Sequence, residues 1–130
     1  MKTLKNAKFV LLSTVLLAFN YSCKKNDIGG DAEIHVLVYH HDTPIKASTL
    51  YVKFDAKSEP SDPTSNYDLK LLGEEDENHV HVEGLRAGNY YLYAVGYDSI
   101  ANKEVSGGMA TEIKWSERKK LKEVTLDVGH

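Results

Sequence analysis

Apolar and polar residues alternate one by one along much of the chain, and this pattern constrains the fold more than any other feature. The alternation is clear in residues 32–40, 48–54 and 122–128, where for example Ile34 and Val36 share one side. Successive side chains of a β-strand point to opposite faces of a sheet, so a period of two predicts strands that each bury one face.

The remaining apolar segments are short and are separated by turn signals. Further strands are predicted at 67–71, 79–82, 89–97 and 109–115. Residues 58–66 contain two prolines with Ser and Asp and are predicted to form a loop. Helical periodicity is absent after residue 31, although residues 116–120 suit one helical turn or a charged loop. We therefore expect an all-β fold, an antiparallel sandwich of seven or eight strands.

The N-terminal residues have the three parts of a secretory signal. Three lysines precede an apolar stretch at 9–19, and the small residue Ser22 comes before the expected cut. An apolar run of about 11 residues is shorter than the roughly 20 that a membrane-spanning helix needs. We expect residues 1–22 to be a signal peptide that is removed.

Cys23 is the only cysteine of the chain and directly follows that signal. Ser22-Cys23 resembles the end of the lipobox of bacterial lipoproteins, and the lysines and acid in residues 24–27 resemble Bacteroidetes-type lipoproteins. Asn20-Tyr21 departs from the usual lipobox residues. The resemblance implies that Cys23 is acylated, and several acyl chains give stable membrane anchoring.

The resemblance also implies an organisation and a location. Residues 23–31 would be the lipidated cysteine and a flexible tether, and residues 32–130 a single domain. The protein would be anchored at the cell envelope, at the outer membrane, on its periplasmic or its surface side. The alternative is a secreted protein with an unpaired thiol.

The charge balance excludes one class of partner. Cleavage after residue 22 removes three lysines from the 16 Lys+Arg and none of the 19 Asp+Glu, which leaves a formal net charge of about −6. Nucleic-acid binding needs a basic surface, so no nucleic-acid partner is expected. A single cysteine allows no internal disulfide and no thiolate metal cluster, so the core must be stable without them.

Residues 82–98 carry a second resemblance. Gly84-Leu85, then Gly88, then Tyr90-x-Leu92-x-Ala94 resembles the signature of prealbumin-like (transthyretin-like) sandwiches, which carboxypeptidase-regulatory-like and Cna-B-like domains share. It implies a prealbumin-like or Ig-like sandwich with residues 90, 92 and 94 facing the core. The chain lacks the Tyr-Arg-Gly-Ser ending of the hydroxyisourate-hydrolysing enzymes of this type. We therefore carry over no chemistry.

His79 and His81 are candidate metal ligands, because residues two apart on a strand project from the same face. Val80 and Val82 are the expected buried set, which puts both imidazoles on the outer face. His35 from a neighbouring strand, or His40 and His41 from the first turn, could complete a site. The favoured interpretation is two solvated histidines and no bound metal or other cofactor.

Tyr91, Tyr93 and Tyr97 are candidate partner contacts, on the face opposite Tyr90. An exposed aromatic stripe suits a protein or glycan partner, because flat rings offer large contact area at low entropic cost. The alternative is that the stripe packs on a neighbouring strand or under the Pro-containing loop.

The sequence contains no Gly-x-Ser-x-Gly, no His-Glu-x-x-His and no phosphate-binding Gly loop. The acidic residues 74–77 lack the spacing of a calcium loop. Our leading hypothesis is a non-enzymatic, lipid-anchored envelope protein whose sandwich acts as a binding or assembly module. The alternatives are a periplasmic metal-binding or hydrolytic enzyme using His79 and His81, and a glycan-binding accessory lipoprotein.

Overall fold

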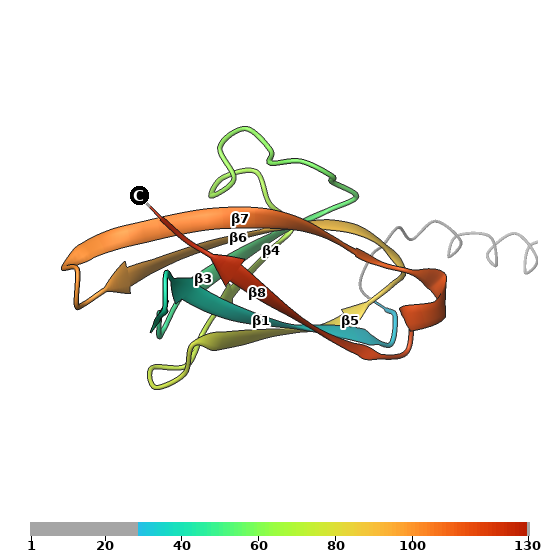
Figure 1. Ribbon diagram of the computed structural model, residues 1–130. Helices are drawn as coiled ribbons and strands as arrows, with labels where there is room; N and C mark the ends of the chain where they lie inside the picture. The colour runs from blue at the N-terminus through green and yellow to red at the C-terminus, as the bar shows by residue number, and fades with distance from the viewer. Residues whose placement is uncertain (1–28, 130) are drawn as a thin grey trace, which may run out of the picture.

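Two four-stranded sheets make up the fold of the computed structural model, which describes residues 29–129 (Figure 1). The first sheet contains β1 (Ala32–His40), β2 (Thr43–Pro44), β5 (His79–Leu85) and β8 (Leu121–Asp127). The second contains β3 (Thr49–Phe54), β4 (Leu69–Leu72), β6 (Gly88–Asp98) and β7 (Lys103–Ile113). The all-β prediction is confirmed, and the two layers are those of a β-sandwich. The predicted signal peptide and Cys23 lie outside the described residues and stay predictions.

The first and last strands of the domain run parallel to each other. β1 pairs with β8 from Glu33↔Leu121 to Tyr39↔Asp127 in parallel register, whereas every other strand pair is antiparallel in the part of the chain described. The prediction of a purely antiparallel sandwich is therefore wrong at this pair. Because β7 lies in the other sheet, the chain crosses between the layers before β8 begins, and that crossing sets the direction of β8.

The inner faces of both sheets supply one core. In β1, Ile34, Val36 and Val38 are fully buried, as their alternation predicted. In β6, Leu92 and Ala94 are likewise buried, which confirms the inward face expected for this strand. The other core residues come from the facing strands of each layer and include Leu50, Val52, Val80, Val82, Leu85, Val105, Ile113, Val124 and Leu126.

The connection between β7 and β8 differs from the predicted strand at 109–115. β7 begins at Lys103, earlier than expected, and ends at Ile113. Trp115 lies beyond it in a single 3₁₀ turn, η3 (Trp115–Glu117), and is 71% exposed. The prediction that Trp115 continues the strand is wrong, because the chain leaves the sheet there to cross to the other layer.

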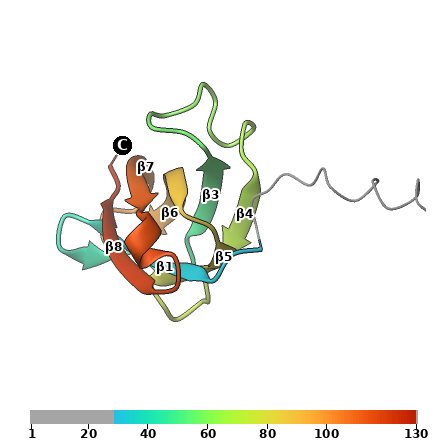
Figure 2. The ribbon, with the colours of Figure 1, turned by 90° about the vertical axis from the view of Figure 1, so that its right-hand side faces the viewer.

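The two ends of the sandwich carry different loops. The start of β1, the β5–β6 turn and the β7–β8 connection lie at one end, which faces the viewer in Figure 2. The β4–β5 loop, the β1–β2 turn and the β6–β7 hairpin lie at the other end. Gly29 and Gly30, which belong to the predicted tether at 23–31, donate their N–H groups to the Gly84 carbonyl at 2.9 and 3.0 Å, so they are fixed to the first of these ends.

Candidate functional site: a metal-ligand cluster

Strand register brings three potential metal ligands together on the outer face of the first sheet. His35 of β1 lies directly opposite His81 of β5 in the antiparallel ladder. Glu33 lies two residues before His35, so its side chain projects from the same face. The residues next to them in sequence, such as Ile34 and Val82, are buried on the inner face. The alternation that builds the core therefore also builds this cluster.

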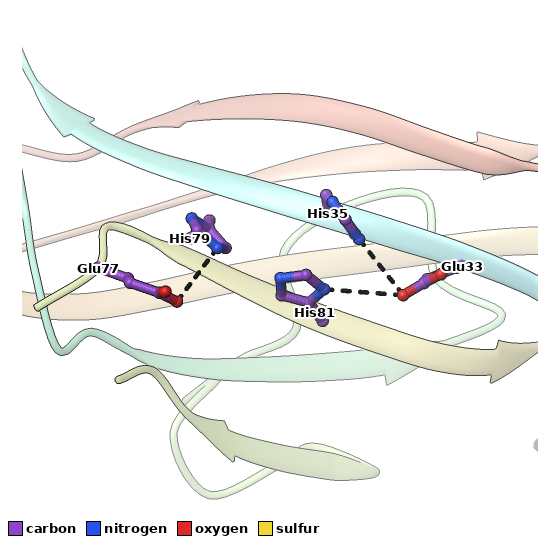
Figure 3. Close-up of polar contacts among 5 residues, drawn as sticks. All are labelled: Glu33, His35, Glu77, His79 and His81. Carbon is purple, nitrogen blue, oxygen red and sulfur yellow. Dashed lines mark hydrogen bonds and ion pairs between the residues drawn. The ribbon is translucent and has the colours of Figure 1, made fainter. Parts of the chain in front are cut away.

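The two histidines of this set converge on the carboxylate of the third residue, Glu33 (Figure 3). The His35 Nε2–H donates to Glu33 Oε2 at 3.3 Å, and His81 Nδ1 lies 3.7 Å from the same oxygen. The rings of His35 and His81 have centroids 3.8 Å apart and are tilted by 55°. One ligand atom from each of the three residues lies within 4.8 Å of the others. Such a set can close on a single ion.

His79 lies beside this cluster and points to a different carboxylate. Its ring centroid is 4.9 Å from that of His81 and 6.4 Å from that of His35. Its Nε2 is 3.2 Å from Glu77 Oε1, in the β4–β5 loop. The expectation that His79 and His81 share the outer face is confirmed, and so is the arrival of His35 from a neighbouring strand. His79 itself stands at the edge of the set.

An open, acidic hollow adjoins the histidines. It has a volume of about 620 Å³ and is lined by Glu74, Glu75, Asp76, Glu77 and His81. The cluster is partly exposed on this side, since the side chains of Glu33, His35 and His81 are 29, 23 and 41% accessible. Carboxylates around a concave surface attract cations and raise their local concentration. An ion can reach the cluster directly from solvent.

The distances fit the geometry of a small late transition-metal ion. Zinc bonds of about 2.0–2.1 Å to imidazole nitrogen and carboxylate oxygen place neighbouring tetrahedral ligand atoms roughly 3.3 Å apart. The Glu33 oxygen already stands 3.3 and 3.7 Å from the two histidine nitrogens. Binding would replace the proton of His35 Nε2 by the metal. Two imidazoles and a carboxylate leave one position open for water.

Tyr91 is not part of an exposed stripe. It is only 9% exposed, and its hydroxyl donates to Glu59 Oε1 at 3.3 Å. Burial, followed by the neighbouring Glu59 carboxylate, raises the pKa of Tyr91 above its ordinary value. The loop between β3 and β4 closes over the ring through Pro60 and Pro63. The prediction of an exposed contact at Tyr91 is wrong, and the alternative of a covering loop is confirmed.

Tyr93 and Tyr97 do not form an exposed aromatic surface either. Tyr93 is half-buried and donates to Ser106 Oγ at 3.1 Å across the β6–β7 ladder. Tyr97 is 53% exposed and donates to the Asn102 side chain within its own hairpin. The three tyrosines therefore have three different environments, and no continuous aromatic surface joins them.

His40 is not part of the metal-ligand cluster and instead forms a buried hydrogen bond that joins the two sheets. Its Nδ1–H donates to Asp98 Oδ2 at 2.6 Å, and both side chains are buried. Asp98 Oδ1 accepts the N–H groups of Ile100 and Ala101 at 2.8 and 2.9 Å, which shapes the β6–β7 hairpin. The His40 hydrogen bond is the main cause that lowers the pKa of Asp98. The pair joins the ends of β1 and β6, one from each sheet.

Glu33 is the functional candidate that sequence reasoning missed. The signal was present, because Glu33-Ile34-His35 and His79-Val80-His81 both alternate potential ligands with buried apolar residues. What the sequence lacked was the register that sets His35 opposite His81.

Searches against protein-family models, curated proteins and solved structures gave no match to this chain. Residues 29–129 contain no helix long and apolar enough to cross a membrane.

Proposed function

We propose that this protein is a non-catalytic, lipid-anchored module of the cell envelope that binds a divalent late transition-metal ion, Zn²⁺ or Cu²⁺. Its ligands are Glu33, His35 and His81. The observation that supports the proposal is the convergence of the two imidazoles, His35 and His81, on one oxygen of the Glu33 carboxylate, at 3.3 and 3.7 Å. The lipid anchor is supported by the lipoprotein-like Ser22-Cys23 junction.

The ligand types favour these ions over calcium or magnesium. Imidazole suits Zn²⁺ and Cu²⁺, whereas Ca²⁺ and Mg²⁺ prefer oxygen ligands alone. The acidic loop at residues 74–77 would attract cations of every kind, so selectivity would come from the two imidazoles. Because imidazoles bind a metal only in their unprotonated form, protons compete with the ion and acidification should weaken binding.

The setting favours binding over catalysis. The cluster lies on the outer face of a sheet and its residues are partly open to water. Catalytic sites gain much of their effect by excluding water and enclosing the substrate, and the acidic hollow would also repel anionic substrates. An exposed three-ligand site with one open position suits an ion that is captured and exchanged.

Isothermal titration with ZnCl₂ and CuCl₂ tests the proposal directly. The parent protein should bind one ion, and His35→Ala and His81→Ala should each weaken binding at least tenfold. Glu33→Gln keeps the shape of the side chain but removes the charge, and should weaken binding as well. His41→Ala is the matched control, because His41 is exposed in the β1–β2 turn, away from the cluster.

The position of His79 gives a graded expectation. His79→Ala should weaken binding less than His81→Ala, because His79 Nε2 faces Glu77 and not Glu33. Equal titration curves for the parent and for His35→Ala and His81→Ala would refute the site. So would a loss of binding in the His41→Ala control of the same size as in the two ligand variants.

A further inference from the structure

A cluster of cations marks the end of the sandwich that holds the start of β1. Residues 114–122, which form the β7–β8 connection and the start of β8, contain five Lys or Arg and one acid, Glu117. Glu117 Oε1 accepts the Lys114 N–H at 2.9 Å and lies 3.7 Å from Lys122 Nζ. Arg86, in the β5–β6 turn, adds a sixth cation at the same end. This basic end contrasts with a chain whose expected mature charge is negative.

Trp115 gives the basic end an exposed aromatic group. Its ring is 71% exposed, and the Arg118 guanidinium lies 4.0 Å from the ring centroid. Leu121, at the start of β8, is 51% exposed nearby in the chain. A hollow of about 360 Å³ at this end is lined by residues that include Trp115, Arg86 and Asp31. Tryptophan with flanking cations is the composition found where proteins meet lipid headgroups.

The chain that leads to Cys23 leaves from the same end. Gly29 and Gly30 are held there by their hydrogen bonds to Gly84. Only residues 24–28 separate Cys23 from Gly29, and the six steps from one Cα to the next span at most about 20 Å when fully extended. β6 alone, with 11 residues, is about 35 Å long. An acylated Cys23 would therefore keep the basic end close to the membrane.

We infer that the basic end, with Trp115 at its centre, docks on the anionic headgroups of the membrane that holds the anchor. The inference rests on the lipid anchor of the proposed function. The opposite end carries the acidic residues 74–77, next to the histidine cluster. At the basic end six cations outnumber Asp31, Glu33 and Glu117, whereas the other end carries the four acids of residues 74–77. This asymmetry would orient the domain on a negative surface, with the β4–β5 loop and its hollow turned to the solvent. Attraction to headgroups falls off within roughly 10 Å at ordinary salt, a distance that so short a tether allows.

The test uses the fluorescence of Trp115, which is the only tryptophan of the chain. Mature acylated protein is reconstituted into vesicles of phosphatidylcholine alone or mixed with phosphatidylglycerol, each made with and without brominated acyl chains. In the anionic vesicles we expect a blue-shifted emission and quenching by bromine at least about twofold stronger than in phosphatidylcholine. High salt should reduce the difference.

Charge reversal provides matched variants. Lys119→Glu/Lys120→Glu changes two exposed cations of the basic end, and should remove the anionic enhancement of quenching. Lys46→Glu/Lys70→Glu changes the net charge equally but lies away from this end, and should leave the enhancement intact.

Flotation of the vesicles separates the two proposals. If the protein floats with the vesicles but Trp115 stays quenched by aqueous acrylamide and not by bromine, the docking is overturned and the anchor stands. If the protein does not float, both the anchor and the docking are overturned. If both charge-reversed variants lose the enhancement of quenching equally, the interaction depends only on net charge, and the inference is also overturned.

Discussion

Replacing Tyr91 distinguishes a buried structural tyrosine from a contact surface. Tyr91→Ala removes a ring that is 9% exposed and that lies under the β3–β4 loop. The ring also packs over Gly108 of β7, where an added Cβ would stand 2.6 Å from the ring carbon Cε2. Tyr91 is therefore enclosed by a neighbouring strand and a loop.

The expected loss can be worked out from this environment. Truncating a buried aromatic residue to Ala lowers the free energy of unfolding by about 3–5 kcal/mol. Because Tyr91 is covered partly by a loop, we expect a loss near the lower value, about 3 kcal/mol. In a domain of this size 1 kcal/mol shifts the melting temperature by about 4–8 °C, so Tyr91→Ala should lower it by roughly 12–24 °C. Tyr91→Phe keeps the ring and loses only the bond to exposed Glu59, which should cost about 0.5 kcal/mol.

Urea unfolding followed by circular dichroism measures these differences. Tyr97→Ala is the matched control, because Tyr97 is 53% exposed and its removal should change the unfolding free energy by about 0.5 kcal/mol or less. A Tyr91→Ala protein as stable as the Tyr97→Ala protein would refute the burial of Tyr91 and would restore the exposed aromatic stripe as a candidate surface.

Three further changes probe other parts of the account. Cys23→Ser should move the protein from the membrane fraction to the soluble fraction, and an unchanged distribution would contradict acylation. The lowered pKa of Asp98, caused first by the His40 hydrogen bond, contributes stability that is present above the ordinary Asp pKa of about 3.9 and is lost as the pH falls through the lower folded value. Acid titration of the unfolding free energy should therefore fall less steeply below about pH 4 in Asp98→Asn than in the parent, and identical slopes would count against the pair. Gly30→Ala places a Cβ 2.1 Å from the Leu85 carbonyl oxygen, so it should destabilise the domain by about 2 kcal/mol in urea, and an unaffected midpoint would show that the chain does not approach there.

The strands were predictable because their signal is local. Alternation in residues 32–40 identified β1 and its buried face, and the dense Tyr and Val residues of 89–97 identified β6. Because side chains alternate between the two faces of a strand, the position of a residue in the pattern indicates which face of the sheet it is on. The same rule correctly put His79 and His81 on the outer face.

Features that depend on distant segments were not predictable in this way. The direction of β8 beside β1 depends on a crossing between layers, and alternation is identical in parallel and antiparallel strands. The burial of Tyr91 depends on a loop more than 20 residues earlier in the chain. The metal-ligand cluster lies between these cases, since the faces of its residues were predictable but the pairing of His35 with His81 was not.

The central claim is that Glu33, His35 and His81 hold one metal ion. A crystal of the zinc-loaded protein, measured at the zinc absorption edge, locates the ion without reference to any assumed site. We predict one strong anomalous peak, about 2.0–2.2 Å from His35 Nε2, His81 Nδ1 and a Glu33 oxygen. A peak elsewhere, in the acidic loop or at His41 for example, or no peak in zinc-soaked crystals, would contradict the account.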